Sequence, residues 1–142
     1  MQFIENKNYL EYMEQLSKEN YSSARKSLLT CLDGFDGEDY QKAYLLKLVA
    51  DTYFLDDKKD KSAEYYVMAE QADELSLQPK LFFAEFMAHK LKDYVNALRK
   101  CDEILQIAKG SPTEETDDDF GTDYYISKAN ELKEFCEDAC QL

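Results

Sequence analysis

Apolar residues recur at intervals of three and four along most of the chain, which is the spacing of one face of an α-helix. Between residues 38 and 55 these positions are Ala43, Leu46, Val49, Ala50 and Tyr53. Strict alternation over the length of a strand does not occur. The pattern predicts an all-α protein with helices at about 8–17, 21–32, 38–55, 62–75, 80–91, 94–108 and 123–141.

Residues that begin or end helices stand between these stripes. Asn20 and Asp60 are expected as N-caps, Gly34 follows the second helix, and Pro79 fits the first turn of the fifth. A length of 142 residues predicts one domain. We expect helix pairs at about 6–33, 38–76 and 79–109, an acidic connection at 110–123 and a final helix at 123–141.

The helix pairs share a pattern of small and large residues. Ala24, Ser62 and Ala97 are 38 and 35 residues apart, and Leu28, Tyr66 and Cys101 follow them at a distance of four. With Leu46-x2-Val49-Ala50-x2-Tyr53, this spacing resembles the tetratricopeptide repeat. The resemblance covers about residues 6–109 and implies an α-α superhelix of three pairs with a C-terminal capping helix. Glu11, Tyr12 and Glu85 depart from the motif, and a non-repetitive helical bundle is the alternative.

The charge is acidic and unevenly distributed. Thirty Asp and Glu against 17 Lys and Arg give a net charge of −13, which disfavours nucleic acid or an anionic membrane as a partner. Residues 33–39 and 110–123 hold ten of these acids and no base, and without them the net charge would be −3. In stacked pairs both segments lie along one edge. This arrangement predicts an acidic rim that binds a partner; the alternative is that both segments are solvated loops. The residues of the predicted rim are Asp33, Asp36, Glu38, Asp39, Glu114, Glu115, Asp117, Asp118, Asp119 and Asp123.

In tetratricopeptide proteins the first helix of each pair lines a concave groove. The resemblance implies that the groove here is lined by Tyr9, Met13, Tyr44, Lys47, Leu48, Asp51, Phe82, Phe83, Phe86 and His89. Aromatic anchors of this kind are typical of protein-binding hot spots. The alternative is that several are core residues and that Tyr125, Leu132 and Phe135 of the final helix fill the groove. A carboxylate clamp does not fit, because Asp51 stands where an Asn is needed.

Patterns for catalysis or cofactor binding do not occur in the sequence. His89 is the only histidine, and no Gly-rich phosphate loop or nucleophile elbow is present. An EF-hand does not fit either, because Gly121 stands at the fifth position counted from Asp117. We therefore expect no enzymatic activity, no cofactor and no metal.

Cys31, Cys101, Cys136 and Cys140 form no CxxC motif, which favours reduced thiols. No signal peptide is visible and no apolar stretch is long enough to span a membrane, so we expect a cytoplasmic protein.

The leading hypothesis is a protein-binding module, and most specifically an acidic immunity or inhibitor protein that neutralises a basic toxin such as a nuclease. Acid clusters mimic phosphate and speed encounter with a cationic cleft. The alternatives are a tetratricopeptide-type chaperone for a secreted protein, which would use the aromatic groove, and a scaffold or regulatory subunit. The sequence fixes no oligomeric state.

Overall fold

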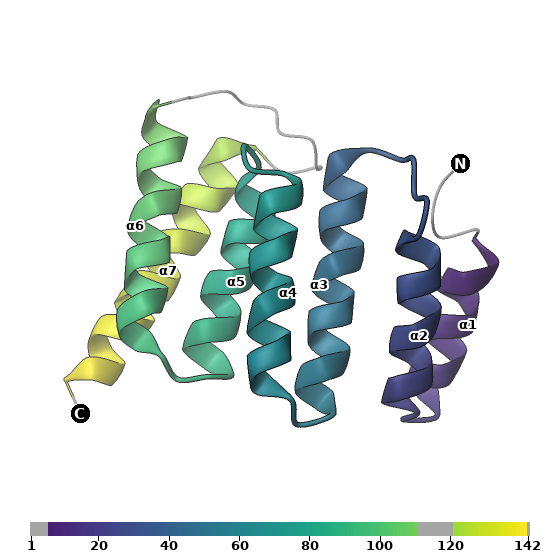
Figure 1. Cartoon of the computed structure of the whole chain (residues 1–142). Coiled ribbons are helices and arrows are strands. Elements are labelled where there is room, and N and C mark those ends of the chain that lie inside the picture. Colours follow the sequence, from purple (N-terminus) through teal and green to yellow (C-terminus); the bar gives the residue numbers. More distant parts are fainter. Residues whose placement is uncertain (1–5, 111–120, 142) are drawn as a thin grey trace. The chain divides into compact units, whose positions relative to one another are not determined.

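The computed structural model describes residues 6–110 and 121–141, and these residues form helices and turns without a strand. The all-α prediction is confirmed. Figure 1 labels the helices, which are α1 (Lys7–Ser17), α2 (Tyr21–Leu32), α3 (Asp39–Leu55), α4 (Lys59–Ala72), α5 (Leu77–His89), α6 (Tyr94–Gly110) and α7 (Thr122–Cys140).

Two helices begin earlier than the apolar pattern predicts. Helix α4 begins at Lys59, so the expectation that Asp60 is an N-cap was wrong; Asp60 lies in the first turn, where its charge complements the helix dipole. Helix α5 begins at Leu77, and the side chain of its N-cap Ser76 accepts a hydrogen bond from the backbone N–H of Gln78 at 3.4 Å. Lys59, Asp60 and Lys61 are exposed, so the apolar stripe of α4 begins only after its first turn. The first turn of α5 is buried, and its start was missed although Leu77 is apolar.

The chain divides into two compact units, residues 1–74 and 75–142. In the first unit, helices pack in sequence order: α1 on α2, α2 on α3 and α3 on α4. The larger core cluster of this unit joins the first three helices. Its buried residues are Tyr12, Ala24, Leu28, Cys31, Leu45, Leu48 and Val49. A smaller cluster of Ala43, Leu46 and Ala69 joins α3 to α4.

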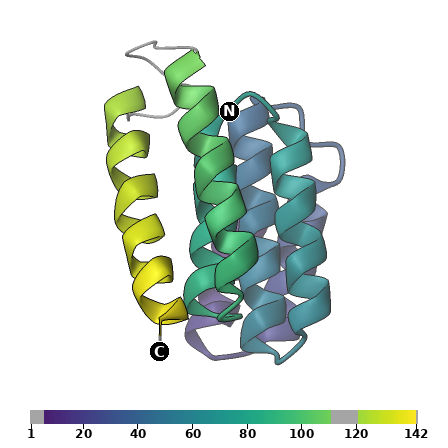
Figure 2. The same ribbon diagram turned by 90° about the vertical axis from the view of Figure 1, so that its left-hand side faces the viewer.

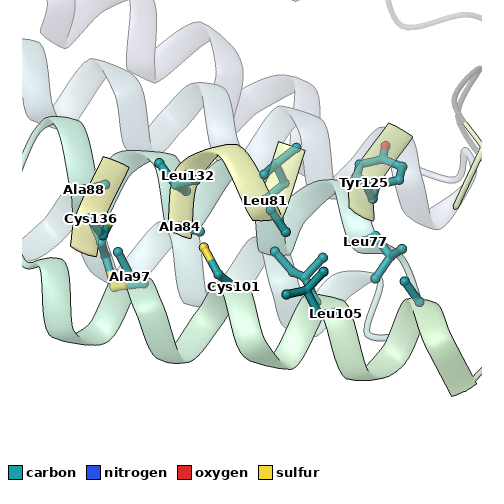
Figure 3. Close-up of a cluster of buried hydrophobic side chains, with 14 residues drawn as sticks. Leu77, Leu81, Ala84, Ala88, Ala97, Cys101, Leu105, Tyr125, Leu132 and Cys136 are labelled. Atoms are coloured by element: carbon teal, nitrogen blue, oxygen red, sulfur yellow. The ribbon is translucent and has the colours of Figure 1, made fainter. Parts of the chain in front are cut away.

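In the second unit, each of the helices α5, α6 and α7 packs against the other two. Figure 2 shows α6 and α7 side by side. Figure 3 shows the core between the three helices, with Leu81 and Ala84 from α5, Cys101 from α6, and Tyr125 and Leu132 from α7. The final helix is therefore part of the core of this unit.

The turn inside each helix pair has the same construction. Glu19, Asp57 and Lys92 adopt left-handed backbone conformations, with φ of 61°, 59° and 56°. Each stands five residues before one of the small residues Ala24, Ser62 and Ala97, which are all 0% exposed. The residues four positions further on, Leu28, Tyr66 and Cys101, are also buried. All three small residues are thus enclosed, and at Ser62 a hydrogen bond of 2.7 Å to the Ala50 carbonyl joins the two helices of the pair directly.

Candidate protein-interaction surfaces

The first candidate surface lies on α1, α3 and α4 of the first unit and is organised around Asp51. Lys47 precedes Asp51 by one helical turn, and its Nζ is 2.9 Å from the Asp51 carboxylate. From α4, the Tyr66 hydroxyl donates a hydrogen bond of 2.5 Å to the other carboxylate oxygen. This carboxylate contacts an ammonium group through one oxygen and a hydroxyl through the other, and the two contacts hold its orientation.

Tyrosine rings surround this ion pair. The rings of Tyr9 and Tyr12 lie 5.6 Å apart on α1, and the Lys47 ammonium is 6.0 Å from the Tyr44 ring centroid. Burial raises the pKa of the Tyr12 phenol, and the Tyr9 phenol and the Asp51 carboxylate raise it further. Burial is also the main cause of the raised pKa of Tyr9. The Tyr9 and Tyr12 phenols are therefore neutral at physiological pH and serve as hydrogen-bonding groups, not as bases.

The structure brings together Tyr9, Tyr44, Lys47 and Asp51 of the residues that the sequence places in the groove. Met13 is 49% exposed on α1. Leu48 is 7% exposed and belongs to the core, in agreement with the alternative that several of the predicted groove residues are core residues. Tyr12 and Tyr66 are 4% and 3% exposed, so they are core residues that support this surface, and sequence reasoning did not predict that role. Tyr12 stands one helical turn from Tyr9, and this spacing was the available signal.

The predicted groove residues of the second unit lie on α5 and differ in exposure. Phe82 and Phe83 are half-buried, Phe86 is buried and His89 is exposed. The Lys100 ammonium from α6 lies 5.7 Å from the Phe83 ring centroid. The three phenylalanines predicted for the groove on α5 therefore expose less aromatic surface to solvent than their number suggests.

The final helix divides its aromatic and apolar residues between the core and solvent. Tyr125 and Leu132 are 1% and 5% exposed in the core of the second unit. Phe135 is 44% exposed, and its ring centroid lies 4.8 Å from that of His89. Phe135 thus contacts a predicted groove residue while remaining partly exposed to solvent.

The acidic residues of the rim prediction fall into two groups. Asp33, Asp36, Glu38 and Asp39 are exposed in and beside the connection between α2 and α3, and Asp123 is exposed in the first turn of α7. The first four make no ion pair with any described residue. Glu38 also accepts a hydrogen bond at the start of α3, where Gln41 bonds back to its N–H at 3.0 Å. The other rim residues, Glu114, Glu115, Asp117, Asp118 and Asp119, lie outside the described residues, and the shared edge stays a prediction.

Two other features bear on chemistry. Within residues 6–110 and 121–141, no group of three or more His, Cys, Asp or Glu is placed to hold a metal ion. Among the helices described, none combines the length and the apolar character that a membrane span requires.

Comparison with known proteins adds no family to this description. No protein-family model matches the chain, and a search of curated proteins found no match.

Proposed function

We propose that this chain is a non-enzymatic protein-binding module that acts as an acidic immunity or inhibitor protein for a basic toxin domain such as a nuclease. The observation that carries the proposal is the exposed acidic segment of residues 33–39. None of its four carboxylates is neutralised by an ion pair with a described residue, so their combined field extends into solvent. Such a segment repels nucleic acid and attracts a basic protein.

The proposal includes the assignment of the three helix pairs as degenerate tetratricopeptide-type repeats. It is supported by the left-handed residue in each within-pair turn and by the fully buried small residue that follows it five positions later. Both features recur with separations of 38 and 35 residues. Repeats of this type bind protein segments on the first helices of their pairs, which here carry Tyr9, Tyr44 and Lys47.

The chain would inhibit a toxin in two ways, by attracting it through opposite charge and by covering its phosphate-binding sites. A net charge of −13 accelerates encounter with a cationic surface, and fast association suits a protein that must arrive before damage occurs. Carboxylates would then occupy the sites where the toxin binds phosphates. No proton transfer or covalent step is required of the chain.

The test begins with the basic domain that the protein captures from the cells that produce it. The association rate is measured for wild type and for Asp33→Asn/Asp36→Asn/Glu38→Gln/Asp39→Asn over a series of salt concentrations. We expect the variant to associate about tenfold more slowly at low salt, with the difference disappearing above about 0.5 M salt. Gln and Asn keep the side-chain oxygens, so Glu38→Gln retains the acceptor at the start of α3.

The matched control removes four exposed acids elsewhere in the first unit through Glu11→Gln/Asp60→Asn/Glu64→Gln/Glu74→Gln. It changes the net charge by the same amount and should slow association less. Equal rates for wild type and the variant of residues 33–39 would refute the proposal. Equal slowing by both variants would show that net charge acts without a local site.

A chaperone for an aggregation-prone client is the second candidate, because Leu10 and Met13 are 57% and 49% exposed on α1. A client held there would be an extended apolar segment. Leu10→Ser/Met13→Ser should then weaken binding of an apolar peptide while leaving salt dependence unchanged. The acidic inhibitor predicts the reverse pattern for its basic partner.

A further inference from the structure

A second surface of interest lies on one flank of α7. Phe135 is 44% exposed, although a phenylalanine that served only the core would be covered by its neighbours. Glu131 precedes it by four residues and Asp138 follows it by three, so both carboxylates lie on the same flank of the helix. The flank therefore presents an open aromatic ring between two acids.

Two other rings fix the position of Phe135. Its ring centroid lies 4.8 Å from that of His89 at the end of α5 and 6.2 Å from that of Tyr94 at the start of α6. The Tyr94 contact is edge-on, with an interplanar angle of 67°. Contacts from two different helices restrict the rotamer of Phe135, so little conformational entropy remains to be lost when a ligand binds to it.

The charges around Phe135 are largely uncompensated. Glu131 is 3.7 Å from Lys128, a long separation between two exposed side chains. Glu134 and Asp138 make no ion pair with a described residue. Lys133 is held on another flank, where its Nζ is 3.1 Å from the carboxylate of Asp102 on α6. The base nearest in sequence to Phe135 is thus already occupied.

We infer that this flank of α7 docks an arginine side chain from a basic segment of a protein partner. The planar guanidinium stacks on an aromatic face and at the same time pairs with carboxylates through its fork of N–H donors. Lysine has a compact, strongly hydrated ammonium that meets the ring and the acids less well. The inference rests on the proposed function, because it names a contact by which a basic partner would be held.

The test uses a probe peptide of alternating glycine and arginine, titrated into the full chain and followed by amide chemical shifts. Amides of residues 131–138 and of His89 and Tyr94 should move together and define one dissociation constant. Phe135→Ala should weaken this constant about three- to fivefold, and Glu131→Gln/Asp138→Asn should weaken it by at least as much. Phe135→Leu keeps apolar area without a ring face and should weaken it as Phe135→Ala does.

The controls separate this site from general attraction between opposite charges. Leu55→Ala removes a side chain that is 50% exposed in the first unit and should leave the constant for α7 unchanged. A peptide with lysine in place of arginine should bind this flank several-fold more weakly. Circular dichroism of each variant checks the helical fold, and the charge variant tests the site with the Phe135 ring still in place.

The inference is overturned if the arginine peptide leaves the α7 amides unmoved, if Phe135→Ala binds as wild type does, or if lysine and arginine bind equally. None of these results alters the association rate of a folded basic partner with residues 33–39. Conversely, equal association rates for wild type and the variant of residues 33–39 in that separate experiment would refute the proposed function even if the arginine peptide bound α7. The two experiments therefore fail independently.

Discussion

Ser62 tests how closely the two helices of a pair approach. Its side chain is 0% exposed, and its Oγ donates a hydrogen bond of 2.7 Å to the carbonyl of Ala50 in α3. Ser62→Ala removes this bond, but the Ala50 carbonyl lies inside a helix and keeps a helical partner, so the expected cost is about 0.5–1.5 kcal/mol. Ser62→Leu also forces a larger, branched side chain into a filled space, which adds about 1–3 kcal/mol. We expect a total for Ser62→Leu of about 1.5–4.5 kcal/mol.

Thermal and urea unfolding followed by far-UV circular dichroism measure these costs. For a chain of this length, 1 kcal/mol corresponds to roughly 3 °C in Tm, so Ser62→Ala should lower Tm by about 1.5–4.5 °C and Ser62→Leu by about 5–13 °C. Ser127 is exposed on α7, and Ser127→Leu should change stability by less than about 0.5 kcal/mol. If Ser62→Leu has the same Tm as wild type, or is more stable than Ser62→Ala, the two helices do not approach closely at Ser62.

The thiols and one ion-pair network give two further predictions. Cys140 is exposed, whereas burial raises the pKa of Cys101 to about 12, so a disulfide reagent at about pH 8 should label Cys140 at once and Cys101 only in denaturant. Mass spectrometry of the labelled peptides decides this, and rapid native labelling of Cys101 would contradict it. Burial alone would raise the pKa of the Glu103 carboxyl, but Lys100 at 3.0 Å and Lys80 at 3.3 Å outweigh this effect and lower the pKa from its usual value. A carboxyl whose pKa is lower in the folded than in the unfolded state stabilises the fold at pH values above its unfolded pKa, and this stabilisation is lost as the pH falls through its folded pKa. In urea titrations between about pH 5 and about pH 3, Glu103→Gln should therefore lose less stability than wild type. Equal losses would show that these ion pairs contribute nothing to stability.

The helices could be predicted because their signal is local. The spacing of Ala43, Leu46, Val49 and Ala50 places these side chains on one face of any α-helix they form, and all four are buried. The three small residues were also readable, since close helix contact excludes a large side chain wherever it occurs. The polar first turn of α4 carried no such signal, so its start was misplaced by three residues.

The candidate surfaces depended on neighbours that lie far apart in sequence. Leu48 and Lys47 are adjacent on α3, yet Leu48 is in the core and Lys47 pairs with Asp51 at partly exposed positions. Tyr66 reaches Asp51 across a separation of 15 residues. The pattern on one helix could not predict these contacts, because they are set by the packing of another helix.

The amino-acid order by itself determined the helical class, the position of each within-pair turn and the acidic character of residues 33–39. These properties depend on local spacing, on side-chain size and on formal charge. Tertiary packing alone decided that Tyr125 and Leu132 are enclosed while Phe135, on the same helix, faces solvent. The reason is physical: exposure is a property of the surrounding chain, and the atoms that cover or leave a side chain come from other helices.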